Sequence, residues 1–220
     1  MSKVGVVLSG CGVYDGAEIH ESVLTLLALD RSKVEAICMA PNIDQHHVIN
    51  HLTGQVVEKE SRNVLIESAR IARGKIKDIK DVCAKDIDAI VFPGGFGAAK
   101  NLCNFAIKGA NCTVNNEVER LVKEMADANK PIGLACIAPS IASKIFENSG
   151  KQVKLTIGTD KDTAKQLKTM GTEHIDCSVK EFVVDKENKI VTTPAYMLGQ
   201  NISDVAEGIE RWIKEIIKLI

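Results

Sequence analysis

Several features that mark particular classes of protein are scarce in this chain of 220 residues. Positive and negative side chains almost cancel, for a formal net charge of -1, and aromatic residues make up only 4% of the sequence. Neither nucleic acid nor a membrane surface is therefore an expected partner, because both favour a basic stripe. No apolar run approaches the roughly twenty residues that cross a bilayer, so we expect no membrane span.

The cysteines are not arranged for disulfides or zinc. There are seven, an odd number, and no two of them form a C-x-x-C pair, so neither a disulfide framework nor a zinc site is expected. The first three residues run directly into a strand-like stretch at 4–8, without the longer apolar segment of a secretory signal. We therefore expect a cytoplasmic protein whose cysteines are reduced thiols.

Three of the five histidines lie close together in sequence, at His46, His47 and His51. His47 and His51 are four residues apart and could share one face of a helix, a spacing that metal sites use. Although Asp44 is nearby, no second acidic or cysteine ligand is placed to complete a set. A polar connecting segment explains the histidines as well, and we expect neither a metal nor an organic cofactor.

Short apolar runs alternate with amphipathic patterns along the whole chain. The runs predict strands at 4–8, 34–39, 88–92, 131–136 and 153–157, and a β-hairpin from 182–184 and 189–193. Apolar residues at helical spacing predict helices at 19–27, 63–73, 117–128, 162–170 and 202–220. We see no repeat and no linker. The alternation predicts a single α/β domain over 1–220, with a doubly wound, mostly parallel sheet sandwiched by helices and a C-terminal β-hairpin.

Sites in such sheets lie at the carboxyl ends of strands, and three loops qualify: 10–21, 93–100 and the segment at Cys136. In the second loop, Gly94 and Gly95 follow a strand. Paired glycines permit positive φ and let a backbone N–H approach a ligand closely, as an oxyanion hole or a phosphate cradle requires. The loop matches neither G-x-G-x-x-G nor a P-loop, and a plain turn is the alternative.

Cys136 occupies the most informative position. An apolar run reaches it, and Pro139 then fits the first turn of a helix that we expect to begin at about Ile137. A thiol at the positive end of a helix dipole has its thiolate stabilised, so we expect the pKa of Cys136 to be lowered. A cysteine at a strand-to-helix elbow favours a nucleophile. The alternative is a buried structural cysteine.

Sequence motifs at these loops carry a resemblance to a known family. They are Gly16-Ala17-Glu18 followed by Glu21, Phe92-Pro93-Gly94-Gly95, and the Ala135-Cys136 elbow. With them the chain resembles the PfpI-like superfamily, the flavodoxin-like relatives of class I glutamine amidotransferases. Longer segments at 8–16, 93–101 and 191–198 resemble the ElbB glyoxalases more closely, a family also called isoprenoid biosynthesis or enhancing-lycopene-biosynthesis proteins.

The resemblance implies a flavodoxin-like fold with a nucleophile elbow and gives four residues a role. Cys136 would be the nucleophile and Glu21 the carboxylate that contacts its sulfur. The N–H groups of Gly95 and Ile137 would stabilise an oxyanion. Relatives that hydrolyse amides place a histidine directly after the cysteine, or further along the chain, whereas only His174 follows the elbow here. Protease or glutaminase activity through a Cys-His pair is therefore not expected.

Two further expectations concern the first helix. Burial beside a negative thiolate would push Glu21 toward its protonated form and raise its pKa. His20 adjoins Glu21 in sequence, but neighbouring helix residues point about 100° apart, so His20 is only a secondary candidate.

The resemblance implies an activity that these residues can perform. It is the conversion of glyoxal, or another small dicarbonyl, to a hydroxy acid such as glycolate, without glutathione and without a cofactor, and it carries a link to isoprenoid biosynthesis. A homodimer is the expected assembly. The alternative is a cysteine redox sensor, or a partner-binding protein, with little turnover on the same fold.

Overall fold

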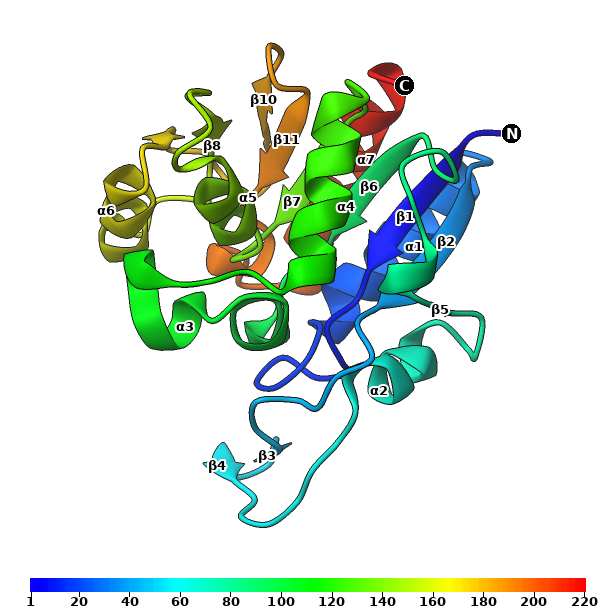
Figure 1. Ribbon diagram of the computed structural model, residues 1–220, viewed down its shortest axis with the longest axis vertical. Coiled ribbons are helices and arrows are strands. Elements are labelled where there is room, and N and C mark those ends of the chain that lie inside the picture. Colours follow the sequence, from blue (N-terminus) through cyan, green and yellow to red (C-terminus); the bar gives the residue numbers. More distant parts are fainter.

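The computed structural model describes residues 1–220 and is organised around a seven-stranded sheet (Figure 1). In spatial order, the strands are β10 (Val183–Asp185), β11 (Ile190–Thr193), β7 (Ile132–Ala135), β6 (Ala89–Phe92), β1 (Lys3–Val7), β2 (Glu35–Ala40) and β5 (Lys77–Asp78). Every neighbouring pair is parallel except β10 and β11, which form the predicted hairpin. The series β2-β1-β6-β7-β11 is the flavodoxin-like order, and this confirms the predicted fold class.

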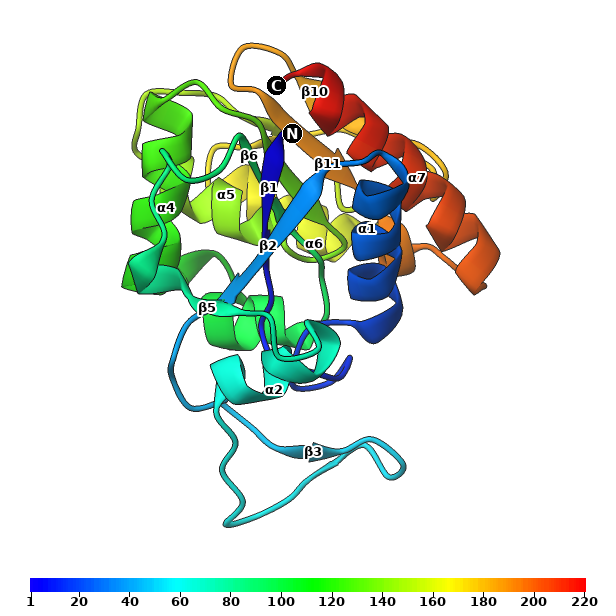
Figure 2. The same ribbon diagram turned by 90° about the vertical axis from the view of Figure 1, so that its right-hand side faces the viewer.

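Helices cover both faces of the sheet. They are α1 (Ile19–Arg31), α2 (Val64–Ile71), α3 (Phe105–Lys108), α4 (Asn116–Asp127), α5 (Pro139–Phe146), α6 (Lys161–Thr169) and α7 (Ile202–Lys218). Figure 2 shows α4 and α5 on one side of the sheet and α1 and α7 on the other. Each side closes over its own buried apolar cluster, because the central strands are buried on both faces. None of the helices combines the length and apolar character that a membrane span would need.

Local sequence explains where the helices begin. In α4 the Asn115 side chain accepts hydrogen bonds from the backbone N–H groups of Glu117 and Val118, which have no partner within the helix. The buried residues of α4 recur at helical spacing, at Val118, Leu121, Val122 and Met125. Asn63, Asp160 and Asn201 cap α2, α6 and α7 in the same way. These helices therefore begin within a residue or two of their predicted starts.

The structure differs from the predictions in several places. Helix α5 begins at Pro139, two residues later than expected, because residues 136–138 form a turn. The strand expected at 153–157 is only β8 (Lys154–Leu155), which pairs with β9 (Glu173–His174) in a separate two-stranded sheet. The loop at 93–100 leads into a π-helical turn at Ala98–Leu102, which no sequence pattern indicated.

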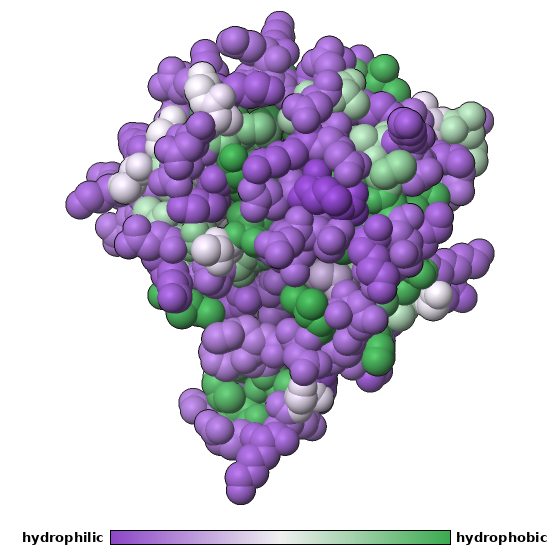
Figure 3. Space-filling model, in the orientation of Figure 1, coloured by the Kyte–Doolittle hydropathy of each residue, from purple (hydrophilic) through white to green (hydrophobic).

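The segment that holds three of the histidines projects from the body. It contains the short antiparallel pair β3 (Ile49–Asn50) and β4 (Gln55–Val56), so the helix face considered for His47 and His51 does not exist. Figure 3 shows hydrophilic residues over most of the visible face, with a hydrophobic patch on this projection. Leu52, in the turn between β3 and β4, is 94% exposed.

Trp212 provides a test of how α7 is held against the sheet. Its indole is fully buried and donates a hydrogen bond from Nε1 to the Val191 carbonyl. We expect Trp212→Ala to lower the free energy of unfolding by about 3–5 kcal/mol, because it leaves a cavity and removes the hydrogen bond of the indole. Urea unfolding followed by circular dichroism measures this change. Ile220→Ala, at a half-exposed position, is the control, and equal losses in the two variants would contradict this view of α7.

Candidate active site

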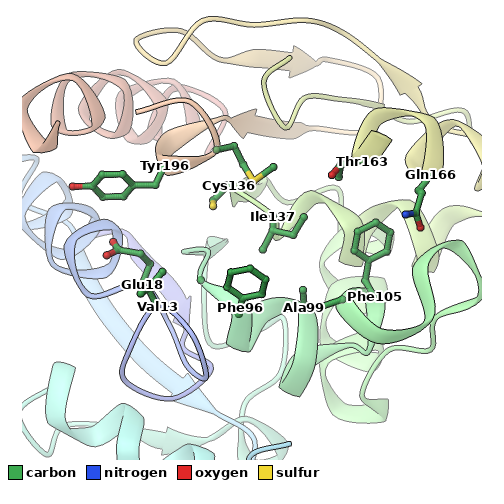
Figure 4. Close-up of a pocket in the computed structure, with 13 residues that line it drawn as sticks. Val13, Glu18, Phe96, Ala99, Phe105, Cys136, Ile137, Thr163, Gln166 and Tyr196 are labelled. Atoms are coloured by element: carbon green, nitrogen blue, oxygen red, sulfur yellow. The ribbon is translucent and has the colours of Figure 1, made fainter. Parts of the chain in front are cut away.

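Three loops meet at the carboxyl ends of β1, β6 and β7, beside the point where the strand order reverses. They enclose a cavity of about 380 Å³ whose lining is mostly apolar. Cys136 lies in its wall, as Figure 4 shows, with Tyr196 and Glu18 on one side and Phe105 on the other. Parallel strands thus bring together the loops that the sequence singled out.

Cys136 sits on a strained turn directly after β7. Its φ is 59°, in the left-handed region that non-glycine residues rarely occupy. Gly94 makes room for it, since a Cβ on Gly94 would lie 2.3 Å from the Cβ of Cys136. A strand, a strained residue and a following helix constitute the nucleophile elbow that was expected.

The sulfur of Cys136 has three hydrogen-bonding neighbours. Its thiol donates to the carboxylate of Glu21, and the backbone N–H groups of Gly95 and Ile137 donate to the sulfur. Neither of these N–H groups donates to a backbone carbonyl. Gly95 has a φ of 93°, and a Cβ there would lie 2.4 Å from the Glu18 nitrogen, so the loop requires glycine. All four residues named from the sequence therefore gather at one point.

Glu21 is completely buried beneath the sulfur. Its Oε2 accepts a hydrogen bond from the Gly94 N–H at 2.8 Å, and its Oε1 accepts one from the Tyr196 N–H at 3.0 Å. Burial raises the pKa of Glu21 from 4.5 to about 7, with a further contribution from the Glu18 charge. The expected direction is confirmed, but one expected cause is wrong, because the Cys136 thiol donates to the carboxylate and so lowers its pKa.

The expected lowering of the Cys136 pKa is also wrong. Burial raises the pKa of this thiol well above its usual value, and the Glu21 charge adds to the effect. The N–H groups of Gly95 and Ile137 oppose the rise without cancelling it. Helix-terminus effects are worth about 0.3–1 kcal/mol, and α5 begins three residues beyond the sulfur. Desolvation therefore wins, and the resting form is a thiol.

Two side chains at the site had no role assigned from the sequence. Glu18 lines the cavity, and its Oε2 accepts a hydrogen bond from the Glu21 N–H at 2.6 Å, so it also caps α1. An acidic residue just before a helix is a signal that could have identified it. Tyr196 also lines the cavity, and its hydroxyl lies 2.8 Å from Nδ1 of His20. The segment 191–198 carried part of the sequence resemblance, but no pattern in it gave Tyr196 a role, because Tyr196 comes from the far end of the chain.

The other histidines lie away from Cys136. His174, on β9, accepts a hydrogen bond from the Ile157 N–H and does not line the cavity. His51 contacts Asp15 and the Tyr14 N–H at the base of the projecting segment. No group of three or more histidine, cysteine, aspartate or glutamate side chains is arranged to hold a metal ion.

Comparison with known proteins places this geometry among relatives. No family model matches the chain. Over 99% of its length the chain is 48% identical to the ES1 protein homolog, mitochondrial, of Rattus norvegicus, and it covers 84% of that protein. It is 47% identical, again over 99% of its length, to the glutamine amidotransferase-like class 1 domain-containing protein 3, mitochondrial, of Homo sapiens, of which it covers 83%.

Solved structures show the same architecture. An isoprenoid biosynthesis protein with an amidotransferase-like domain from Ehrlichia chaffeensis superposes with a TM-score of 0.92 at 38% identity, covering 99% of this chain and 100% of that one. Glyoxalase III of Candida albicans superposes with a TM-score of 0.65 at 15% identity, covering 100% and 97%. The second likeness concerns the fold alone.

The raised pKa of Glu21 predicts a pH dependence of stability. Between about pH 4.5 and pH 7 the unfolded chain loses this proton while the folded protein keeps it. The contribution of Glu21 to the free energy of unfolding therefore falls as the pH rises through that window. Glu21→Gln cannot ionise, so its unfolding free energy relative to wild type should rise with pH across the window, by on the order of 3 kcal/mol. Urea titrations at several pH values test this, and parallel curves for the two proteins would contradict it.

Proposed function

The chain belongs to the ES1 family of glutamine amidotransferase-like class 1 proteins, and on that premise we propose that it is a glutathione-independent glyoxalase. Its substrate would be glyoxal or another small dicarbonyl, and its product the hydroxy acid, glycolate in the case of glyoxal. The supporting observation is the arrangement around the sulfur. The Cys136 thiol lies between a carboxyl of pKa about 7 and two backbone N–H groups that no carbonyl uses.

The first proposed step is addition of sulfur to an aldehyde. Glu21, ionised in part of the molecules near neutral pH, takes the thiol proton as the sulfur–carbon bond forms and the carbonyl π bond breaks. The N–H groups of Gly95 and Ile137 then stabilise the oxyanion of the hemithioacetal. Glu21 returns the thiol proton to this oxygen, which becomes a hydroxyl, and Glu21 is again a base. A base near pKa 7 compensates for a thiol that is not ionised at rest.

The second step is an internal oxidation and reduction. Glu21 removes the hydrogen from the carbon bonded to sulfur as a proton, giving an enediol, and returns a proton to the neighbouring carbon. The first carbon rises to the oxidation level of a thioester, while the second is reduced from an aldehyde to an alcohol. Water then cleaves the thioester, which releases glycolate and restores the thiol. Electrons and atoms balance, so this scheme uses no cofactor.

The family name contains the word amidotransferase, but the site lacks the base that hydrolysis of glutamine uses. Release of ammonia from an amide needs a proton donor, commonly a histidine paired with the cysteine. Here Ile137 follows Cys136, and His174 lies outside the cavity. An aldehyde has no such leaving group. The geometry therefore favours carbonyl chemistry.

A redox sensor is less well supported by the same geometry. Cysteines that sense oxidants are accessible and have low pKa values, because the thiolate is the form that reacts. Cys136 is only 8% exposed, and burial raises its pKa.

The wider setting of the activity is also a proposal. A link to isoprenoid biosynthesis rests on the name of the Ehrlichia chaffeensis protein and on the sequence resemblance. The cytoplasmic location stays a prediction from the sequence, while the rat and human relatives are named as mitochondrial proteins. Subcellular fractionation distinguishes the two locations.

We also propose that the protein is a homodimer, as the sequence resemblance implied. Helix α1 packs against α7 on one side. It leaves Ile19, Val23 and Leu27 exposed at intervals of four residues, which places them on one face. An apolar stripe on a helix that carries a site residue suits contact with a second copy of the chain.

The Glu21→Gln variant distinguishes two hypotheses: that the protein is an enzyme, and that it only binds other molecules through its cysteine. Glu21→Gln removes the base and also a negative charge that raises the Cys136 pKa. We expect glycolate formation from glyoxal to fall by roughly 10²- to 10⁴-fold. Alkylation of Cys136 by iodoacetamide should be no slower than in wild type, since the thiolate becomes easier to form.

Controls make this outcome specific. Cys136→Ser should abolish glycolate formation, and Cys83→Ser, which alters a cysteine outside the cavity, should not affect it. Assays without glutathione, with glycolate quantified by chromatography, give the rates, and peptide mapping gives the labelling. Absence of turnover in wild type, or full turnover in Glu21→Gln, would overturn the proton-shuttle mechanism.

A charge placed in the α1 stripe tests the dimer. Val23 is 48% exposed, so Val23→Glu should not disturb the fold of one subunit. It should shift the mass measured by light scattering toward the monomer, because a carboxylate at an apolar interface loses its hydration. Val56→Glu, at a similarly exposed position on β4, is the matched control. A monomeric wild type, or an unchanged mass for Val23→Glu, would disprove this interface.

A further inference from the structure

The cavity beside Cys136 is much larger than glyoxal requires. Its volume is about 380 Å³, room for roughly a dozen waters at their liquid volume. Cavities of roughly 300–1,000 Å³ take ligands the size of drug molecules. Glyoxal is only two carbonyl groups joined together and would leave most of this space to water. The size of the cavity therefore suggests a larger substrate.

The walls beyond the sulfur are apolar. Figure 4 shows that Ile137, Phe96, Ala99 and Phe105 extend from Cys136 toward α6. Polar groups appear again on α6, where Thr163 and Gln166 lie near Phe105. Water in such a space finds few partners, so an apolar group that displaces it gains free energy.

The charges of the cavity lining indicate the charge of the group that the substrate carries. Glu18 is the one acidic side chain in the cavity wall, and no lysine, arginine or histidine lines it. The Nζ of Lys100 lies over the ring of the lining residue Phe96, but Lys100 itself does not line the cavity, and it donates to the Tyr14 carbonyl. A carboxylate or phosphate on the substrate would have no cationic partner here, and Glu18 would repel it. The space suits a neutral group.

Chemistry fixes which part of the substrate would fill the space. In an α-oxoaldehyde the sulfur adds to the aldehyde, because that carbon is less hindered than the ketone. The substituent on the ketone carbon then points away from Cys136. We propose that the natural substrates are α-oxoaldehydes whose ketone carries a neutral, apolar group about the size of a phenyl ring, held along Ile137, Phe96 and Phe105. This inference rests on the proposed function.

The first test compares substrates on the wild-type protein. In hydrophobic pockets, each added methylene is worth about 10- to 200-fold in discrimination. We expect kcat/KM for phenylglyoxal to exceed that for glyoxal by at least about tenfold, with methylglyoxal between them. The product, mandelate, is quantified by chromatography from initial rates. A preference for glyoxal over phenylglyoxal would overturn the inference.

Two variants on α3 test where the apolar group of the substrate binds. Each variant is compared with wild type on the same substrate, so differences in intrinsic reactivity between substrates cancel. Ala106 lines the cavity and is exposed to solvent, whereas its neighbour Ile107 is exposed and lies outside it. Ala106→Phe should lower kcat/KM for phenylglyoxal at least about tenfold more than it lowers kcat/KM for glyoxal. Ile107→Phe, the matched control, should change neither. Equal loss with both substrates in Ala106→Phe would contradict the proposed position.

A measurement without turnover separates this inference from the proposed function. Benzamide and acetamide are neutral and unreactive, and their binding is followed by ligand-observed NMR. We expect benzamide to bind wild type more tightly than acetamide does, and Ala106→Phe to weaken benzamide alone. If benzamide binds as expected while no dicarbonyl is converted, the glyoxalase proposal fails. The inference that the cavity holds a neutral, apolar group is then still supported. If glyoxal is converted but benzamide shows no preference, only the inference about substrate size fails.

Discussion

A carboxyl group buried directly beneath a thiol is the constraint on which this site depends. Glu21 has no exposed surface, and a buried carboxyl is costly unless donors surround it. The donors come from Gly94, after β6, and Tyr196, after β11. The Cys136 thiol, after β7, supplies a third hydrogen bond. One carboxyl group thus contacts the carboxyl ends of three strands. Glycines are needed at positions 94 and 95 because the backbone there lies too close to its neighbours to leave room for a Cβ.

Much of the fold could be predicted because it follows from local patterns. Apolar runs marked the central strands, and capping residues such as Asn115 marked where helices begin. The elbow was predictable as well, since a strand that meets Pro139 after small residues leaves few alternatives for Cys136. Short elements were not. In the π-helical turn at Ala98–Leu102, Asn101 donates to the distant carbonyls of Ser9 and Asp15, and in β3 the Ile49 N–H donates to the Asp15 carboxylate.

The site was predictable in its residues and less so in its electrostatics. Motifs identified Cys136 and Glu21, but the sign of the Cys136 pKa shift depends on burial, which a sequence does not display. The helix-dipole argument used a real effect, typically of about 0.3–1 kcal/mol, and omitted burial, which is the largest influence on the pKa of this thiol. Tyr196 escaped notice for another reason. Its N–H reaches Glu21 across 175 positions of the chain, and only the strand order brings them together.

The hydrogen bond between Tyr196 and Glu21 determines when, during synthesis of the chain, the site can be completed. Ribosomes deliver the N-terminal part first, whereas a domain generally folds as a unit. The loop of Glu21, the Gly94 donor and the Cys136 elbow are all synthesised before β11. Until Tyr196 emerges, Oε1 of Glu21 lacks its backbone donor, and the cavity lacks the wall that Tyr196 and Met197 provide. The thiol site is therefore complete only once the residues after 190 have been made and have joined the sheet.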